Sequence, residues 1–158
     1  MNLSRAEYAA LQRKRAQPVK AEGELLAVWV PGKLVNTKNA RWYWRRETEY
    51  KQQWKERVAL ALLECGWMRG ILPVAAPSSL KHVSFLAHTR NAMDTDGLEV
   101  ALAPVRDALA ECGVITGKRE RAGRGDAPRD GHEFTYTQRI DRTHRGVEIR
   151  VSLRPAGD

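Results

Sequence analysis

The sequence predicts an α+β domain in which two main helices pack on a small mixed β-sheet. Two segments repeat apolar residues every three or four positions, as amphipathic helices do. Four shorter segments are apolar runs or alternate apolar with polar residues, as strands do. The chain has 158 residues, a length that suits one domain, and 42% of them are hydrophobic, which is enough for a buried core.

The first part of the chain predicts a helix, a strand and a polar loop. Residues 3–15 are expected to form a short helix with a thin apolar stripe. We therefore assign residues 1–20 to an N-terminal helix or arm and residues 21–155 to the domain. Residues 24–30 form an apolar β-type run that ends at a Pro-Gly pair, and residues 33–46 form a polar loop rich in Asn, Lys, Arg and Trp.

Both main helices are predicted from an apolar stripe that ends before a glycine, Gly66 in the first helix and Gly113 in the second. The first helix runs from about Glu47 to Cys65, and the second follows an Asp-Thr-Asp-Gly motif. The stripes consist of Tyr50, Trp54, Val58, Leu62 and Cys65 in the first helix and of Leu98, Leu102, Val105, Leu109 and Cys112 in the second. Pro104 lies inside the second helix, where we expect a kink or a displaced first turn.

The remaining strands are expected over residues 81–88, 133–140 and 146–153, because apolar and polar residues alternate there. The short turn over residues 141–145 predicts that the last two strands form an antiparallel hairpin. Residues 117–131 are rich in Gly, Arg and Asp and are expected to form a basic loop that contributes nothing to the core.

The charge of the chain favours a polyanionic partner. The formal net charge is +8 and the sequence pI is about 9.9, which favours nucleic acid first and an acidic membrane surface second; an interaction protein with incidental charge is the alternative. No stretch approaches the roughly 18 apolar residues of a membrane span, and the N-terminus lacks the apolar centre of a signal peptide. Two cysteines without a Cys-x-x-Cys pair predict a cytoplasmic protein without structural zinc.

The sharpest feature is the pair Asp94 and Asp96, between an expected strand and an expected helix. In an extended stretch, side chains two residues apart point to the same side, with Cα atoms about 6.5 Å apart. Two such carboxylates suit Mg²⁺, with Mn²⁺ as an alternative ion, because Mg²⁺ prefers oxygen ligands and retains several waters. A structural role is the alternative, since Asp96 is a good helix N-cap and Glu99 would complete a capping box.

A further metal ligand is expected from the acidic residues of the 117–131 loop, with Asp126 and Asp130 as the first candidates and Glu120 as another. Of these, Asp126 is the residue that we expect to act with Asp94 and Asp96 in catalysis. A solvated loop without a metal role is the alternative for each of them. The four histidines lack ligand spacing to one another.

Basic and aromatic residues interleave in the segment 33–46. The candidates for contacts with DNA are Lys33, Asn36, Lys38, Arg41, Arg45, Arg46, Arg90, Lys118 and Arg119. Arg90 either touches the scissile phosphate or pairs with Asp94. Trp42, Tyr43 and Trp44 either stack on unpaired bases or anchor the segment to the core, and for the two tryptophans we favour anchoring.

Three motifs, taken together, resemble the RusA family of Holliday-junction resolvases, especially its phage and prophage members. They are NTKNARWYW (36–44), DTDGL (94–98) and RDALAECGV (106–114), within a likeness that covers roughly residues 25–153. The resemblance implies a homodimeric, Mg²⁺-dependent endodeoxyribonuclease of DNA recombination and repair, which cuts branched DNA such as four-way junctions in a bacterial or phage-infected cell. Asp94 and Asp96 match the family's first two acidic positions.

The sequence departs from the family pattern in three places. Gly97 stands where family members usually carry Asn, residues 116–118 (Thr-Gly-Lys) replace an acidic pair, and no lysine follows the aspartates in the helix. The third ligand would therefore come from Asp126 or Asp130. The alternative function is a branched-DNA-binding protein derived from the family that does not cleave.

Overall fold

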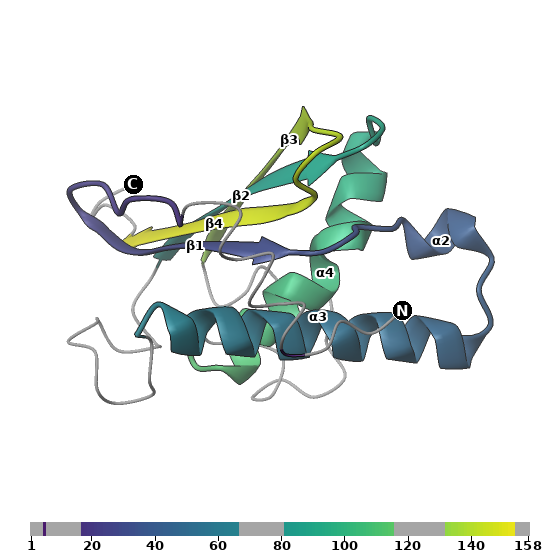
Figure 1. Cartoon of the computed structure of the whole chain (residues 1–158), viewed down its shortest axis with the longest axis horizontal. Helices are drawn as coiled ribbons and strands as arrows, with labels where there is room; N and C mark the ends of the chain where they lie inside the picture. Colours follow the sequence, from purple (N-terminus) through teal and green to yellow (C-terminus); the bar gives the residue numbers. More distant parts are fainter. Residues whose placement is uncertain (1–4, 6–16, 67–80, 116–131, 154–158) are drawn as a thin grey trace.

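The computed structural model describes Arg5 and residues 17–66, 81–115 and 132–153. Its elements are, in order, β1 (Glu24–Pro31), α2 (Thr37–Ala40), α3 (Trp44–Glu64), β2 (Lys81–Thr89), α4 (Thr95–Glu111), β3 (Glu133–Ile140) and β4 (Gly146–Leu153). The strands form one mixed sheet, with α3 and α4 crossing on one side of it (Figure 1). The prediction of an α+β fold with two main helices on a small mixed sheet is confirmed.

The strands lie in the order β1-β4-β2-β3, in which β4 pairs antiparallel with β1 and β2, and β2 pairs parallel with β3. The predicted hairpin of the last two strands is therefore wrong, because β2 lies between them. Residues 141–145 can pass over one strand, since five extended residues reach about 16 Å and two strand spacings amount to about 10 Å. The burial of the two strands agrees with this order. Most residues of β4, which lies between β1 and β2, are buried or half-buried, whereas every second residue of the edge strand β3 is exposed.

One face of the sheet carries the apolar residues of its strands. Val28, Ile149, Phe85 and Tyr136 are in register across β1, β4, β2 and β3, and the first three are fully buried. The helices cover this face with the buried side chains Tyr50, Trp54, Val58, Ala61 and Leu62 of α3 and Leu98, Leu102, Val105 and Leu109 of α4. Both predicted stripes thus face the core, except that Cys65 is exposed at the end of α3.

The polar segment between β1 and α3 is more helical than the sequence predicts. The short helix α2 begins after Asn36, whose side chain accepts a hydrogen bond from the backbone N–H of Lys38 at 3.2 Å. Arg41 ends α2 with a left-handed backbone (φ 51°). After the extended residue Tyr43, α3 starts at Trp44 instead of near residue 47. The expected loop over residues 33–46 is therefore wrong in part.

The far ends of both main helices follow the sequence prediction. Gly66 and Gly113 have φ values of 87° and 81° and directly follow the C-caps of α3 and α4. Pro104 is buried inside α4, which continues to Glu111. The ends of both helices require a backbone angle that favours glycine, so the positions of the glycines in the sequence predict them.

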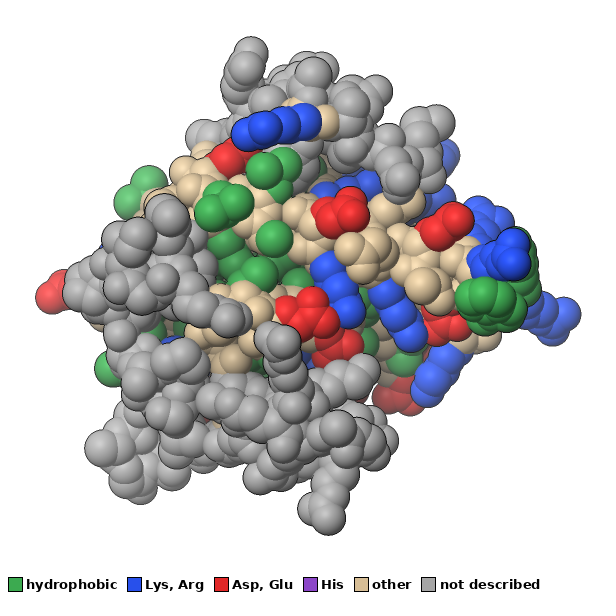
Figure 2. Space-filling view, turned by 90° about the horizontal axis from the view of Figure 1, so that it is seen from below, with side chains coloured by type: hydrophobic (Ala, Val, Ile, Leu, Met, Phe, Trp, Pro, Cys, Tyr) green, Lys and Arg blue, Asp and Glu red, His purple; other side chains and the backbone are tan. Residues whose placement is uncertain are grey.

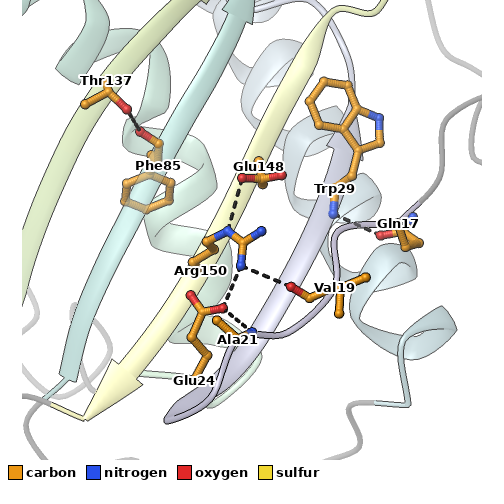
Figure 3. Close-up of polar contacts among 9 residues, drawn as sticks. All are labelled: Gln17, Val19, Ala21, Glu24, Trp29, Phe85, Thr137, Glu148 and Arg150. Carbon is orange, nitrogen blue, oxygen red and sulfur yellow. Dashed lines mark hydrogen bonds and ion pairs between the residues drawn. The ribbon is translucent and has the colours of Figure 1, made fainter.

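The segment before β1 is fastened to the sheet by polar contacts (Figure 3). Arg150 of β4 forms an ion pair with Glu24 at 2.6 Å and donates to the carbonyl oxygen of Val19 at 3.2 Å. The Gln17 side chain accepts the N–H of Trp29 at 3.0 Å, on the side of β1 that faces away from β4. The Gln17 contact satisfies one backbone N–H on the edge of the sheet, where such groups would otherwise be unpaired.

Two predicted segments, the helix over residues 3–15 apart from Arg5 and the loop over residues 117–131, lie outside the described residues. The division of the chain at residue 20 also stays a prediction. Among the residues that the structure describes, no helix combines the length and apolar character of a membrane span.

Candidate functional site

The acidic pair lies where the chain leaves β2 and enters α4. Asp94 is the N-cap of α4, and its Oδ1 accepts the N–H of Gly97 at 2.7 Å. Asp96 lies in the first turn of the helix, and both carboxylates are exposed. The predicted capping role of Asp96 is therefore wrong, because the helix already begins at Thr95. Only Asp94 has an extended backbone, so the first turn of α4, not an extended stretch, determines how the two carboxylates lie.

The loop that carries the pair is held by Gln138 on β3. Its Oε1 accepts the backbone N–H of Met93 at 2.9 Å, and its Nε2 donates to the carbonyl oxygen of the same residue at 2.5 Å. Both hydrogen bonds end one residue before Asp94. Because one side chain satisfies both backbone groups, the entry of the chain into α4 is fixed from the edge strand of the sheet.

Tyr50 of α3 brings the segment before α2 against α4. Its hydroxyl group accepts the N–H of Val35 at 2.9 Å and donates to the carbonyl oxygen of Ala101 at 3.1 Å. Burial raises the pKa of Tyr50 to about 12, so the hydroxyl keeps its proton at neutral pH. The next residue along the chain, Asn36, is thereby placed near the start of α4.

Gly97 marks the point at which the two segments meet. A Cβ atom added to Gly97 would lie 2.5 Å from Oδ1 of Asp94 and 2.8 Å from Nδ2 of Asn36. A side chain at this position, such as the Asn that the resembled family carries, therefore requires the side chains of Asp94 and Asn36 to move. Glycine here permits the amide of Asn36 to lie against the first turn of α4, next to Gly97.

The donor set at this site fits a hard cation such as Mg²⁺. Oδ2 of Asp94 and both oxygens of Asp96 are not used by the hydrogen bond that caps α4. Mg²⁺ is held in many sites by one or two carboxylates together with water and substrate phosphates. Within the described residues, no group of three or more His, Cys, Asp or Glu side chains is arranged to hold a metal. Asp126, Asp130 and Glu120 lie outside those residues.

The basic residues predicted to contact DNA lie on the surface around α2 and the start of α3. Lys33, Lys38, Arg41, Arg45 and Arg46 are exposed, and Asn36 is half-buried. Figure 2 shows Lys and Arg side chains gathered at this end of the molecule. Arg90 is exposed just after β2. The other candidates, Lys118 and Arg119, lie outside the described part of the chain.

The three aromatic residues of this segment have different surroundings. Trp42 is half-buried, with its ring centroid 5.5 Å from that of Tyr50 and the guanidinium of Arg46 4.5 Å from its own centroid. Tyr43 and Trp44 are 65% and 67% exposed. Anchoring to the core is confirmed for Trp42 and is wrong for Trp44, because α3 begins at Trp44 and turns its side chain outward.

A His–Asp pair, of which only the histidine is buried, lies at the end of β2 that leads toward Asp94. Nδ1 of His88 is 3.2 Å from Oδ2 of Asp141, and His88 is fully buried. The backbone N–H groups of His144 and Thr143, followed by His88, lower the pKa of the Asp141 carboxyl below its usual range. Asp141 accordingly remains charged and organises the turn between β3 and β4, which is a structural role.

The sequence patterns did not predict the hydrogen bonds that Gln138, Tyr50 and Asp141 make with residues distant in the chain, although they did place Tyr50 in the buried stripe of its helix. Asp141 carries a weak local signal, since an Asp at the start of a turn commonly accepts backbone N–H groups two and three residues later. Comparisons with protein-family models, curated proteins and solved structures gave no match.

Proposed function

We propose that the chain is a Mg²⁺-dependent endodeoxyribonuclease that cuts branched DNA such as Holliday junctions. One observation carries the proposal: Asn36 of the basic segment 33–46 packs against Gly97, between the two exposed aspartates Asp94 and Asp96 and the body of α4. Phosphodiester cleavage on DNA requires this combination, because an acidic metal site repels phosphate unless cations surround it. The motif resemblance to RusA-type resolvases supports the same chemistry.

In this proposal Oδ2 of Asp94 and the carboxylate of Asp96 hold the ion, and Asp126 or Asp130 completes the ligand set. The chemistry that bound Mg²⁺ supplies is activation of water and neutralisation of charge on the phosphate. The amide of Asn36 is positioned to orient a phosphate beside the pair. Exposed Lys and Arg side chains of the basic segment bind the flanking backbone.

The test is nicking of synthetic four-way junctions with and without Mg²⁺. Asp94→Asn keeps the helix cap, because Asn caps as well as Asp, and it removes only the charge; we expect this variant and Asp96→Asn to lose cleavage by at least about 100-fold. Glu99→Gln is the matched control, because it removes the same charge from an exposed position of the same helix. Full cleavage by either aspartate variant contradicts the proposal.

A second candidate is a branched-DNA-binding protein without catalysis. It is favoured by the sequence, in which Thr-Gly-Lys at 116–118 stands where the resembled family carries an acidic pair. It predicts salt-sensitive junction binding, no cleavage with any divalent metal and unchanged binding by Asp94→Asn. The single measurement that separates the two candidates is cleavage by the wild-type protein.

The proposed enzyme acts as a homodimer in the cytoplasm, since two sites related by a two-fold axis suit paired nicks across a four-way junction. Light scattering tests this assembly: the expected mass is twice the 17.9 kDa of one chain. A monomeric mass at working concentration contradicts the dimer but leaves the metal site untouched.

A further inference from the structure

We propose that Tyr43 and Trp44 form a stacking platform for unpaired DNA bases. With Arg45, these residues make up what we call the aromatic tip, at the start of α3. The inference deepens the proposed function, because it names the part of a branched substrate that the basic segment recognises: nucleotides that have left the duplex.

The first argument is exposure. Tyr43 and Trp44 are consecutive and 65% and 67% exposed, whereas Trp29 and Trp54 are buried to within 1%. Figure 2 shows hydrophobic side chains beside Lys and Arg at the outermost end of the molecule. Adjacent exposed rings at a helix start indicate a binding role, because aromatic side chains ordinarily bury most of their surface.

The second argument is rigidity beneath the rings. Trp44 is the first residue of α3, a helix of 21 residues that is buried along one face. The neighbouring Trp42 packs against Tyr50, so the backbone that leads into the tip is held by the core. A fixed platform loses little conformational entropy when a base stacks on it.

The third argument is charge. Residues 33–46 contain five Lys or Arg and no Asp or Glu, and the guanidinium of Arg45 lies 5.3 Å from the ring centroid of Trp44. Cations that follow a phosphate backbone, next to rings that accept any base, characterise surfaces that bind single strands without sequence preference. A membrane surface fits less well, since the exposed face of α3 beyond the tip is polar, with Glu49, Lys51, Gln52 and Glu56.

The test measures binding of a labelled 20-nucleotide dT strand, a forked duplex and a blunt duplex, at one salt concentration and in EDTA. Trp44→Ala should weaken binding of the dT strand and the fork about tenfold, and binding of the blunt duplex by less than about twofold. Trp44→Phe, which keeps an aromatic face, should restore most of the affinity. Trp44→Leu, which keeps only apolar area, should not.

Two control variants separate the rings from other effects. Leu63→Ala removes an exposed apolar side chain, 58% exposed, from the opposite end of α3 and should leave all three affinities unchanged. Arg45→Ala removes charge and should weaken single-stranded and double-stranded DNA alike. Thermal unfolding of each variant confirms that the fold is intact.

The platform proposal is overturned if Trp44→Ala loses affinity equally for all three DNAs, or if it loses none. It is likewise overturned if the tip instead binds vesicles of phosphatidylserine and phosphatidylcholine, or if Trp44→Ala only dissociates a dimer. Binding is measured without metal, so this test does not depend on cleavage. If the nuclease proposal alone fails, the protein does not cleave junctions but still binds single strands in a manner that depends on Trp44.

Discussion

The starts of α3 and α4 are opposite in chemistry although both begin a helix that covers the same face of the sheet. At α4, Asp94 caps the helix and Asp96 lies in its first turn, where negative charge is favourable. At α3, Tyr43 occupies the N-cap without a side-chain hydrogen bond, and Arg45 and Arg46 precede the acidic Glu47 in the first turn. Positive charge at this end of a helix is unfavourable, by roughly 0.3–1 kcal/mol per residue.

The difference shows which contacts stabilise the start of each helix. The start of α4 satisfies its own backbone and gains support from Gln138, so the acidic residues are compatible with a purely structural account as well as with a metal site. The start of α3 is held by Trp42 and Tyr50 instead, and its exposed residues act against the helix. A local sequence that opposes its own structure indicates selection for another role.

The largest effect is expected from Gly97→Ala, which tests how tightly the two segments meet. Alanine in a helix ordinarily stabilises relative to glycine, but here its Cβ would lie 2.5 Å from Oδ1 of Asp94 and 2.8 Å from Nδ2 of Asn36. We expect the free energy of unfolding to fall by about 2 kcal/mol in urea denaturation. Adding Asn36→Gly should recover part of this loss; a stabilising Gly97→Ala would show that the contact is loose.

Tyr50→Phe tests the hydroxyl group that joins the two regions. It leaves the N–H of Val35 without a partner and removes the second hydrogen bond to the carbonyl of Ala101, which also lies within the backbone ladder of α4; we expect a loss of about 1–2 kcal/mol at pH 7. The wild-type pKa of about 12 exceeds the ordinary 10.0. The Tyr50 contribution is therefore complete below pH 10 and is lost as pH rises from 10 to 12.

The alkaline loss amounts to roughly 2 kcal/mol. It is measured as the difference between wild type and Tyr50→Phe in denaturation series across pH 8–12. Parallel curves for the two proteins would contradict the buried, protonated hydroxyl.

A smaller effect is expected from Gln138→Ala, which releases the loop before Asp94. Two backbone groups of Met93 lose their partner, at a cost of about 1–2 kcal/mol. Amide hydrogen exchange of Met93 should accelerate, while that of the α3 start should not change. Exchange that accelerates equally at both helix starts would show that the two regions are not independent.

The smallest effects come from exchanging the caps. Asp94→Ala should destabilise by about 1 kcal/mol and Asp94→Asn by much less, whereas Tyr43→Ser should stabilise by about 0.5–1 kcal/mol, because it adds a cap that α3 lacks. Thermal unfolding measures all three. A destabilising Tyr43→Ser would indicate that the tyrosine ring contributes to the fold and is not free for another role.

Features that depend on neighbouring residues were predicted correctly from the chain. The apolar stripes of both helices, their glycine ends and the bounds of β3 and β4 follow from periodicity and backbone angles, which are local properties. The helix starts were less accurate, because Asp94 and Asp96 are both good caps and the sequence does not choose between them; in the structure Asp94 is the cap.

Only the tertiary structure determined the strand order, which residues lie beside the acidic pair, and the exposure of Trp44. Each depends on residues far apart in the chain: β2 separates β3 from β4, Gln138 reaches Met93, and Tyr50 joins Val35 to Ala101. A hydrophobic pattern states which face of an element is buried but not what buries it. The type of each element and the acidic and basic chemistry were thus present in the sequence, whereas their meeting at one end of the sheet required the fold.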